Sequence, residues 1–165
     1  MSSDYQQFSI YGFSVNYPTG CRVEFNPKSK EYEGDVVFHF PDTSKIFLSW
    51  GELEKAIGNF ETVEGHAEHS LEKVRKSGNV KNFQKISEDL VDVNSHRAAF
   101  NVVSLEEITV GLLTGKQSSP RRAYSIHVHC ENSARYFVIY GIFHAETTED
   151  YGKIIVSMSS SLNCH

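Results

Sequence analysis

Two histidines and a cysteine stand close together in the segment YSIHVHCENSARYFVIYGIF, residues 124–143. Histidine and cysteine are the side chains that bind zinc or form nucleophile–base pairs in many proteins. Side chains of a β-strand alternate between its two faces, so His127 and His129 share one face and Cys130 points to the other. The spacing therefore disfavours a local Cys–His nucleophile and leaves a His-x-His pair whose two imidazoles point the same way.

A metal site built on His127 and His129 needs further ligands from elsewhere in the chain. The segment EGHAEHSLEK places His66 and Glu68 on a predicted helix. If this helix packs over the strand, these four residues form a candidate site for zinc or manganese. The alternatives are an ordinary polar helix face and a half-buried groove lined by Tyr and His side chains, with Tyr136 opposite His129.

Contact with a partner is the other chemistry that the sequence offers. The segment TGKQSSPRR gathers three cations on a chain of net charge -5, which suits an acidic partner or a phosphate. Exposed aromatic side chains can anchor an interface. The candidate contacts are Lys116, Arg121, Arg122, Trp50, Tyr136 and Tyr140. The alternatives are a solvated flexible loop for the basic residues and core positions for the aromatic ones.

No catalytic motif is present in the sequence. The segment GLLTGK lacks the spacing and the following Ser or Thr of a phosphate-binding loop, and neither G-x-S-x-G nor H-E-x-x-H occurs. The acidic residues near the predicted turns give no reason to assign an acid and a base. These observations favour a non-enzymatic protein without a cofactor, with a small-ligand carrier or an enzyme using the Tyr/His groove as the remaining alternative.

Length and composition predict one globular domain over residues 1–165, since 39% of the residues are hydrophobic and 12% aromatic. The mildly acidic balance, without a Lys/Arg run, argues against nucleic-acid and anionic-membrane binding. No apolar run approaches the ~20 residues that cross a bilayer. Three cysteines without a spaced framework, and a start without a signal sequence, predict a reduced cytoplasmic protein with no disulfide.

Hydrophobic periodicity and turn residues predict four hairpins and two helices. The hairpins span residues 12–25, 35–51, 83–105 and 124–143, with turns at 18–20, 41–44, 94–95 and 132–133; the helices span 62–77, after a short turn, and 146–162, with Thr147 or Thr148 as the N-cap. Residues 105–120 are expected to continue a strand and then form a Gly/Ser/Pro loop. Successive hairpins with apolar residues on both faces predict an α+β fold, an antiparallel sheet covered by helices on both faces.

The predicted arrangement resembles the PsbP-like superfamily, which includes an extrinsic protein of photosystem II, a nuclear Ran-binding import factor and DcrB-type proteins. The resemblance rests on YGFSVNYPTGC, on the mid-chain helix, on VDVNSHRAAF and on RRAYSIHVHCENSARYFVIYGIF followed by a helix that ends in SMSSSL. Cys21 and Ser95 depart from the Trp and the turn Gly common in that superfamily. The resemblance implies an α/β/α sandwich that binds an unidentified protein partner or assembly, as a monomer or a homodimer.

Overall fold

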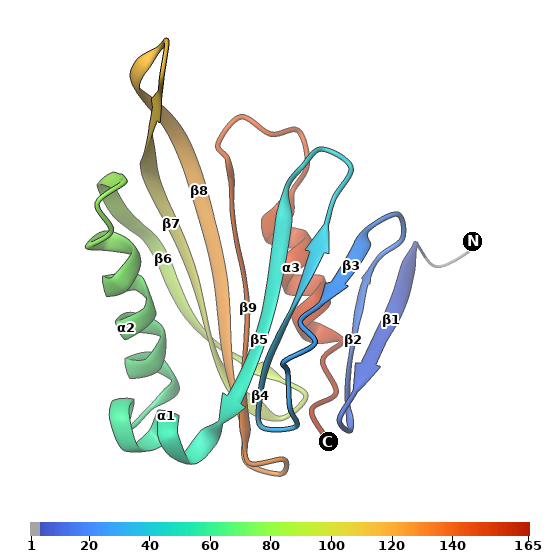
Figure 1. The fold of residues 1–165 in the computed structure, drawn as a ribbon. Coiled ribbons are helices and arrows are strands. Elements are labelled where there is room, and N and C mark those ends of the chain that lie inside the picture. The colour runs from blue at the N-terminus through green and yellow to red at the C-terminus, as the bar shows by residue number, and fades with distance from the viewer. Residues whose placement is uncertain (1–3) are drawn as a thin grey trace.

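A seven-stranded antiparallel sheet forms the centre of the structure, a computed structural model that describes residues 4–165 (Figure 1). Its strands lie side by side in the order β3-β4-β5-β9-β8-β7-β6. Their bounds are Arg22–Phe25 for β3, Glu33–His39 for β4, Lys45–Glu52 for β5, Val80–Val93 for β6, His96–Gly111 for β7, Gly115–Cys130 for β8 and Arg135–His144 for β9. The prediction of an antiparallel sheet is confirmed.

Helices and a small second sheet cover the two faces of this sheet (Figure 1). One face carries α1 (Leu53–Phe60) and α2 (Val63–Arg75), and the other carries α3 (Tyr151–Ser160) with the hairpin of β1 (Tyr5–Ile10) and β2 (Phe13–Pro18). Strands with apolar residues on both faces need this double cover. The α+β class with helices on both faces is therefore confirmed. None of the described helices is long and apolar enough to span a bilayer.

The larger core lies between the sheet and the layer of α3 and β2. Trp50 of β5 is 2% exposed, and its indole N–H donates to the carbonyl of Lys30 at 2.9 Å. The ring centroids of Trp50 and Phe13 lie 4.9 Å apart. Gly34, which pairs with Trp50 across β4 and β5, leaves room for the indole, because a Cβ there would lie 2.3 Å from the ring. The only tryptophan of the chain thus anchors this core.

Three of the predicted hairpins have the predicted pairing. In the β6–β7 turn, Asn94 and Ser95 have φ angles of 47° and 69°, and Asp92 pairs with Arg97. Positive φ at both central residues is the geometry of a type I′ hairpin turn, which asparagine tolerates well. The hairpins β4–β5 and β8–β9 are confirmed as well, and α2 matches the helix predicted over 62–77.

The first predicted hairpin is wrong in its pairing. β2 pairs with β1 across Tyr11 and Gly12, whereas β3 pairs with β4 in the large sheet. Gly20, in the predicted turn, has a positive φ of 94°. The chain at that point passes from the small sheet to the large one instead of folding back on itself. The alternation of apolar and polar residues along β2 is compatible with pairing to the strand before it or to the strand after it. The alternation alone therefore does not show which of the two becomes the partner.

Three further segments differ from the sequence expectation. The short turn before α2 is the helix α1. Residues 115–120 belong to β8 rather than to a loop, and they pair with β7. The N-cap of α3 is Asp150, whose side chain accepts from the backbone N–H of Lys153 at 3.0 Å, in place of Thr147 or Thr148. Aspartate caps a helix at least as well as threonine, so residue type alone does not choose among neighbouring candidates.

Candidate functional site

Three histidines from two elements meet between α2 and the sheet. His66 lies on α2, and His127 and His129 lie on β8. A hydrogen bond of 3.1 Å joins His66 Nδ1 and His129 Nε2, and the ring centroids of His66 and His127 lie 4.9 Å apart. Tyr136, which pairs with His129 across β8 and β9, contacts His66 with a centroid distance of 4.7 Å. The structure therefore brings together three of the four residues proposed as metal ligands.

Ser70 determines which nitrogen of His127 carries the proton. The hydroxyl of Ser70 donates to the backbone carbonyl of His66 at 3.2 Å. Because a hydroxyl has a single proton, its oxygen must accept in the 3.0 Å contact with His127 Nε2. His127 is therefore protonated on Nε2, and its Nδ1 is a buried acceptor without a partner among residues 4–165. Such an atom costs about 1–3 kcal/mol and marks a place where a donor group fits.

Burial keeps the three imidazoles neutral near pH 7. Burial lowers the pKa of His66 to about 4, and the neighbouring His129 adds a smaller effect in the same direction. Burial also lowers the pKa of His127 to about 3. The pKa of His129 is lowered by burial, against the opposing influence of the charge on Glu64. The histidine cluster is therefore a polar but uncharged surface beneath α2.

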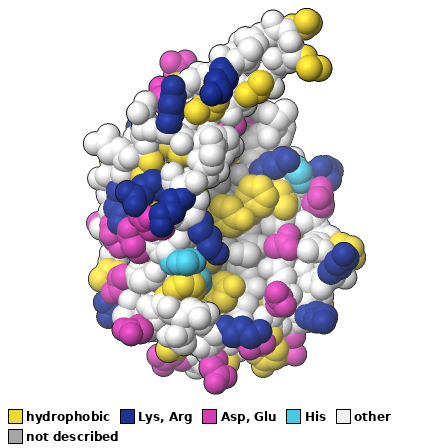
Figure 2. Space-filling view, turned by 60° about the vertical axis from the view of Figure 1, so that its left-hand side comes forward, with side chains coloured by type: hydrophobic (Ala, Val, Ile, Leu, Met, Phe, Trp, Pro, Cys, Tyr) yellow, Lys and Arg dark blue, Asp and Glu magenta, His cyan; other side chains and the backbone are white. Residues whose placement is uncertain are grey.

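A hollow of about 370 Å³, the α2 groove, opens beside the histidines between α2 and strands β5, β8 and β9. Figure 2 shows hydrophobic side chains gathered in this hollow, with Lys and Arg side chains on either side of it. Tyr140 stacks on Phe47 with a centroid distance of 5.0 Å. Tyr140 and Ile142 remain 38% and 39% exposed. The groove predicted from Tyr and His residues on one strand face is thus present, and part of it faces solvent.

Glu68, the fourth proposed metal ligand, lies apart from the histidine cluster. Its carboxylate pairs with Lys85 of β6 at 2.5 Å near the protein surface, and Lys85 also pairs with Glu88 at 2.9 Å. A metal bound by His66 together with the two histidines of β8 would have to do without this carboxylate. Zinc or manganese binding at the histidines stays a prediction.

The three aromatic candidates for partner contacts lie in two different environments. Trp50 is buried in the core, so its proposed role as an exposed anchor is wrong. Its indole occupies the space above Gly34, which the sequence pattern does not reveal. Tyr136 and Tyr140 line the α2 groove, where burial raises the pKa of both phenols. Only the two tyrosines are therefore placed where a ligand or a partner can reach them.

The three basic candidates follow one another along β8 instead of lying in a flexible loop. Arg121 is half-buried, and its guanidinium lies 3.7 Å from the carboxylate of Glu107 on β7. Lys116 and Arg122 are exposed. Lys116 lies beside the turn that joins β7 and β8.

The β7–β8 hairpin extends beyond both of its neighbours (Figure 1). β6 pairs with β7 only as far as Glu107, and β9 pairs with β8 only as far as Arg121, within the described residues 4–165. Over residues 109–119 the two strands pair with each other. Leu112 and Leu113 at the turn are fully exposed, and Figure 2 shows hydrophobic side chains at the end of this projection.

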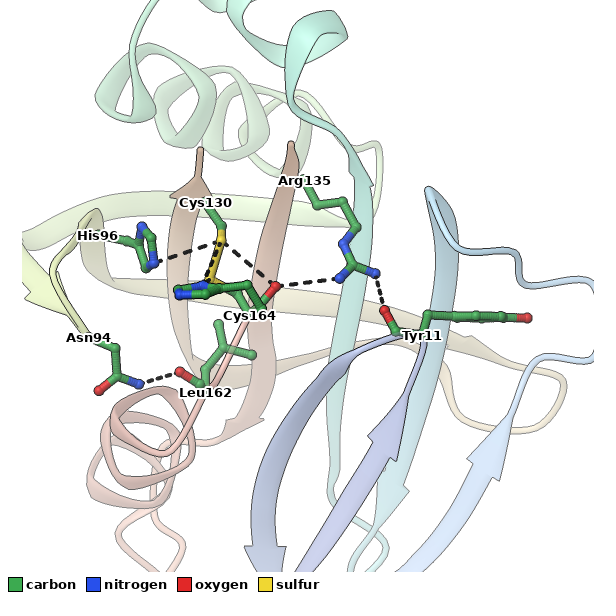
Figure 3. Close-up of a disulfide and its surroundings, with 8 residues drawn as sticks. Tyr11, Asn94, His96, Cys130, Arg135, Leu162 and Cys164 are labelled. Atoms are coloured by element: carbon green, nitrogen blue, oxygen red, sulfur yellow. Dashed lines mark hydrogen bonds between the residues drawn. A yellow bond between two sulfur atoms is a disulfide. The ribbon is translucent and has the colours of Figure 1, made fainter. Parts of the chain in front are cut away.

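Cys130 and Cys164 form a disulfide on the face of the sheet that carries α3 (Figure 3). The expectation of a protein without disulfides is therefore wrong for this pair, whereas Cys21 is free. Counting cysteines gives no distances, and these two become neighbours only when the segment after α3 packs against the end of β8. The expectation of a reduced, cytoplasmic protein loses the support that it took from the cysteines.

Two histidines contact this disulfide. His96 Nε2 lies 3.8 Å from Cys130 Sγ, and His165 Nδ1 lies 3.5 Å from Cys164 Sγ. Among residues 4–165, these four form the only group of three or more His, Cys, Asp or Glu residues whose candidate ligand atoms all lie within 4.8 Å of one another. The sequence analysis singled out neither His96 nor His165 as a candidate ligand. No spacing motif connects the four residues, so the sequence holds no signal for them.

A scan against protein-family models and a search of curated proteins find no match to this chain. Solved structures do match it. The solution structure of cyanobacterial PsbP from Synechocystis sp. PCC 6803 has a TM-score of 0.69 at 12% identity, covering 100% of this chain and 95% of that one. The Ran-binding protein Mog1p of Saccharomyces cerevisiae has a TM-score of 0.63 at 11% identity, covering 99% of this chain and 96% of that one.

The chain has the PsbP-like fold. The prediction drawn from the resemblance is confirmed at this level, since both likenesses span nearly all of the chain. At these identities the likeness concerns the fold alone, and one scaffold can carry unrelated activities. The function of this PsbP-like chain must therefore be argued from its own side chains: the α2 groove, the hairpin tip and the cysteine–histidine cluster.

Proposed function

We propose that the protein is a non-enzymatic protein-binding domain that contacts its partner through the tip of the β7–β8 hairpin. The observation that carries this proposal is the full exposure of Leu112 and Leu113 at the end of a two-stranded projection. Burying one leucine side chain is worth about 1.5–3 kcal/mol, so the pair supplies several kcal/mol when a partner covers it. Single exposed apolar residues are common, whereas a contiguous exposed apolar patch marks an interaction site, and Val110, 75% exposed, extends the apolar surface of the two leucines.

The charge of the tip indicates the kind of partner. Residues 108–119 include Lys116 and no Asp or Glu, although the whole chain has a net charge of -5. A protein surface with an apolar pocket bordered by carboxylates fits the leucines and the lysine together. The Ran-binding protein Mog1p shares the fold and, by its name, binds a protein. This supports a protein-binding role for the scaffold and leaves the partner of the present chain to be found.

Site-specific crosslinking tests the proposal in the cells that make the protein. A photoreactive amino acid replaces Thr114, which is exposed within the hairpin turn. The matched control replaces Val156, which is 43% exposed on α3 and does not belong to the hairpin. We expect a defined protein adduct from the position at the tip and none from the control. An identical adduct pattern from both positions would argue against a site at the tip.

The captured protein is then purified and its affinity measured. We expect the variant Leu112→Ser/Leu113→Ser to raise Kd at least about 100-fold, because the leucines lose their burial energy. Lys116→Glu should weaken binding less, with an effect that shrinks as salt is added. The urea midpoint of unfolding should stay unchanged in both variants, since these side chains are exposed. Unchanged affinity, or binding of the tip to neutral phospholipid vesicles instead of the protein, would contradict the proposal.

A small-ligand carrier is the second candidate function, and the unpartnered Nδ1 of His127 favours it. The α2 groove, at about 370 Å³, falls in the size range of small-molecule sites. Its chemistry fits a compound with an apolar body and one O–H or N–H donor. Titration of small phenols and alcohols, followed by NMR, should shift the signals of Tyr140 and Ile142 in the parent protein. His127→Phe should abolish these shifts, and shifts that persist in this variant would rule out recognition by His127.

A further inference from the structure

The cysteine–histidine cluster has the ligand set of a zinc site. Two thiolates and two imidazoles around a tetrahedral ion, with Zn–S near ~2.3 Å and Zn–N near ~2.0 Å, put sulfur and nitrogen about 3.5 Å apart and the two sulfurs about 3.8 Å apart. In the structure Nδ1 of His165 lies 3.5 Å from Cys164 Sγ and 3.9 Å from Cys130 Sγ, and Nε2 of His96 lies 3.8 Å from Cys130 Sγ. The sulfur–nitrogen separations thus already approach those of a zinc site. Only the two sulfurs, which are bonded to each other in the disulfide, would have to move apart.

The segment that carries Cys164 is held in place by contacts other than the disulfide. Asn163 and Ser14 exchange two backbone hydrogen bonds of 2.8 and 2.9 Å. The guanidinium of Arg135 donates to the carbonyl of Cys164 at 3.4 Å (Figure 3). These contacts do not involve sulfur, so they persist when the disulfide is reduced. The two thiols therefore stay beside each other and beside the histidines.

The cluster is buried except at His165. Cys130, Cys164 and His96 are buried, whereas His165 is exposed, and both histidines line an open pocket of about 640 Å³. A cation from solvent can therefore reach the imidazole of His165 first.

We propose that His96, Cys130, Cys164 and His165 form a redox-gated site for a thiophilic divalent cation, with Zn²⁺ as the expected ion. A thiol reductant supplies two electrons and two protons to the disulfide, yielding two protein thiols and the oxidised form of the reductant. Zn²⁺ then binds both sulfurs and both imidazoles, and the two thiol protons are released to solvent. Because the same sulfurs cannot be bonded to each other and to the metal as thiolates, the disulfide and the zinc-bound state exclude each other.

Cobalt spectroscopy on the full chain tests this site, with Co²⁺ as a visible probe for the position of Zn²⁺. Metal-free protein is compared in its oxidised form and after reduction with a phosphine, which does not compete for the metal as a dithiol would. We expect the reduced form to bind one equivalent of Co²⁺, with the bands of a tetrahedral ion and a thiolate-to-cobalt transition, and to release Co²⁺ when Zn²⁺ is added. The oxidised form should show neither band.

Variants at the histidines identify the ligands without removing the disulfide. His96→Ala and His165→Ala should each weaken Co²⁺ binding by the reduced protein at least about tenfold, because each loses a direct ligand. The control His127→Ala/His129→Ala should bind Co²⁺ as the parent does, and it also tests the site predicted on β8. Circular dichroism establishes that each variant is folded. A reduced parent without the thiolate-to-cobalt transition, or affinities unchanged by both single variants, would overturn the proposal.

Discussion

Replacing Trp50 with alanine is expected to lower the free energy of unfolding by about 3–5 kcal/mol. The indole is buried, packs against Phe13, and donates a hydrogen bond to the carbonyl of Lys30. Removing it leaves a cavity above Gly34, which has no side chain to fill the space. The measurement is urea unfolding followed by far-ultraviolet circular dichroism, because the variant lacks the only tryptophan of the chain. A loss of this size would remove a substantial share of the about 5–15 kcal/mol that stabilises an ordinary domain.

Two controls separate core packing from surface effects. Trp50→Phe keeps an aromatic ring against Phe13 but loses the hydrogen bond, so it should cost less than the alanine variant. Tyr140→Ala removes an aromatic side chain that is 38% exposed in the α2 groove, and its cost should be the smallest of the three. If Trp50→Ala were no more destabilising than Tyr140→Ala, the core position of Trp50 would be refuted.

Acid is expected to destabilise the protein well above the pH at which its carboxylates titrate. The pKa of His127 falls from its ordinary value of 6.5 to about 3, and that of His66 falls to about 4. Above pH 6.5 both histidines are neutral in the folded and unfolded states, so their contribution to stability is fully present. Below it the unfolded chain binds protons that the folded chain excludes, and stability falls by up to about 1.4 kcal/mol per pH unit for each histidine.

The variant His127→Gln tests this assignment, because the amide can still donate to Ser70 but does not titrate. Between pH 6.5 and about 4.5, the free energy of unfolding should fall less steeply with acid in His127→Gln than in the parent. The slopes should differ by the equivalent of about one bound proton, or about 1.4 kcal/mol per pH unit. His39→Gln is the matched control, since that histidine lies on β4 beside Glu24, outside the histidine cluster. Glu64, whose pKa is already below its ordinary 4.5, contributes only below this window. Equal slopes in the parent and in His127→Gln would show that His127 is not kept neutral by burial.

Local patterns were sufficient to predict the elements that depend on neighbours in sequence. Asn94 and Ser95 favour a tight hairpin turn, and that turn alone determines that Asp92 pairs with Arg97. The partner of β2 was not predictable in the same way. The turn at Gly20 is real, but β1 competes for β2 on the other side, and both pairings bury the same apolar face.

The same limit explains which parts of the site were found. Helical and strand periods place His66 above His127 and His129 once α2 packs on β8, so their convergence could be anticipated. Glu68 follows the same helix but turns toward Lys85, because an accessible cation holds its carboxylate. The disulfide and its two histidines depend on how the segment after α3 docks, which no local pattern encodes.

The backbone pairing of Ser14 with Asn163 also has a consequence for biosynthesis. β2 and α3 cover the same face of the sheet, and they come from distant parts of the chain. While the ribosome is still making the segment that precedes α3, the strands that have already emerged expose this aromatic face to water. The nascent chain therefore presents a binding surface for chaperones and gains its final packing only after Asn163 has emerged.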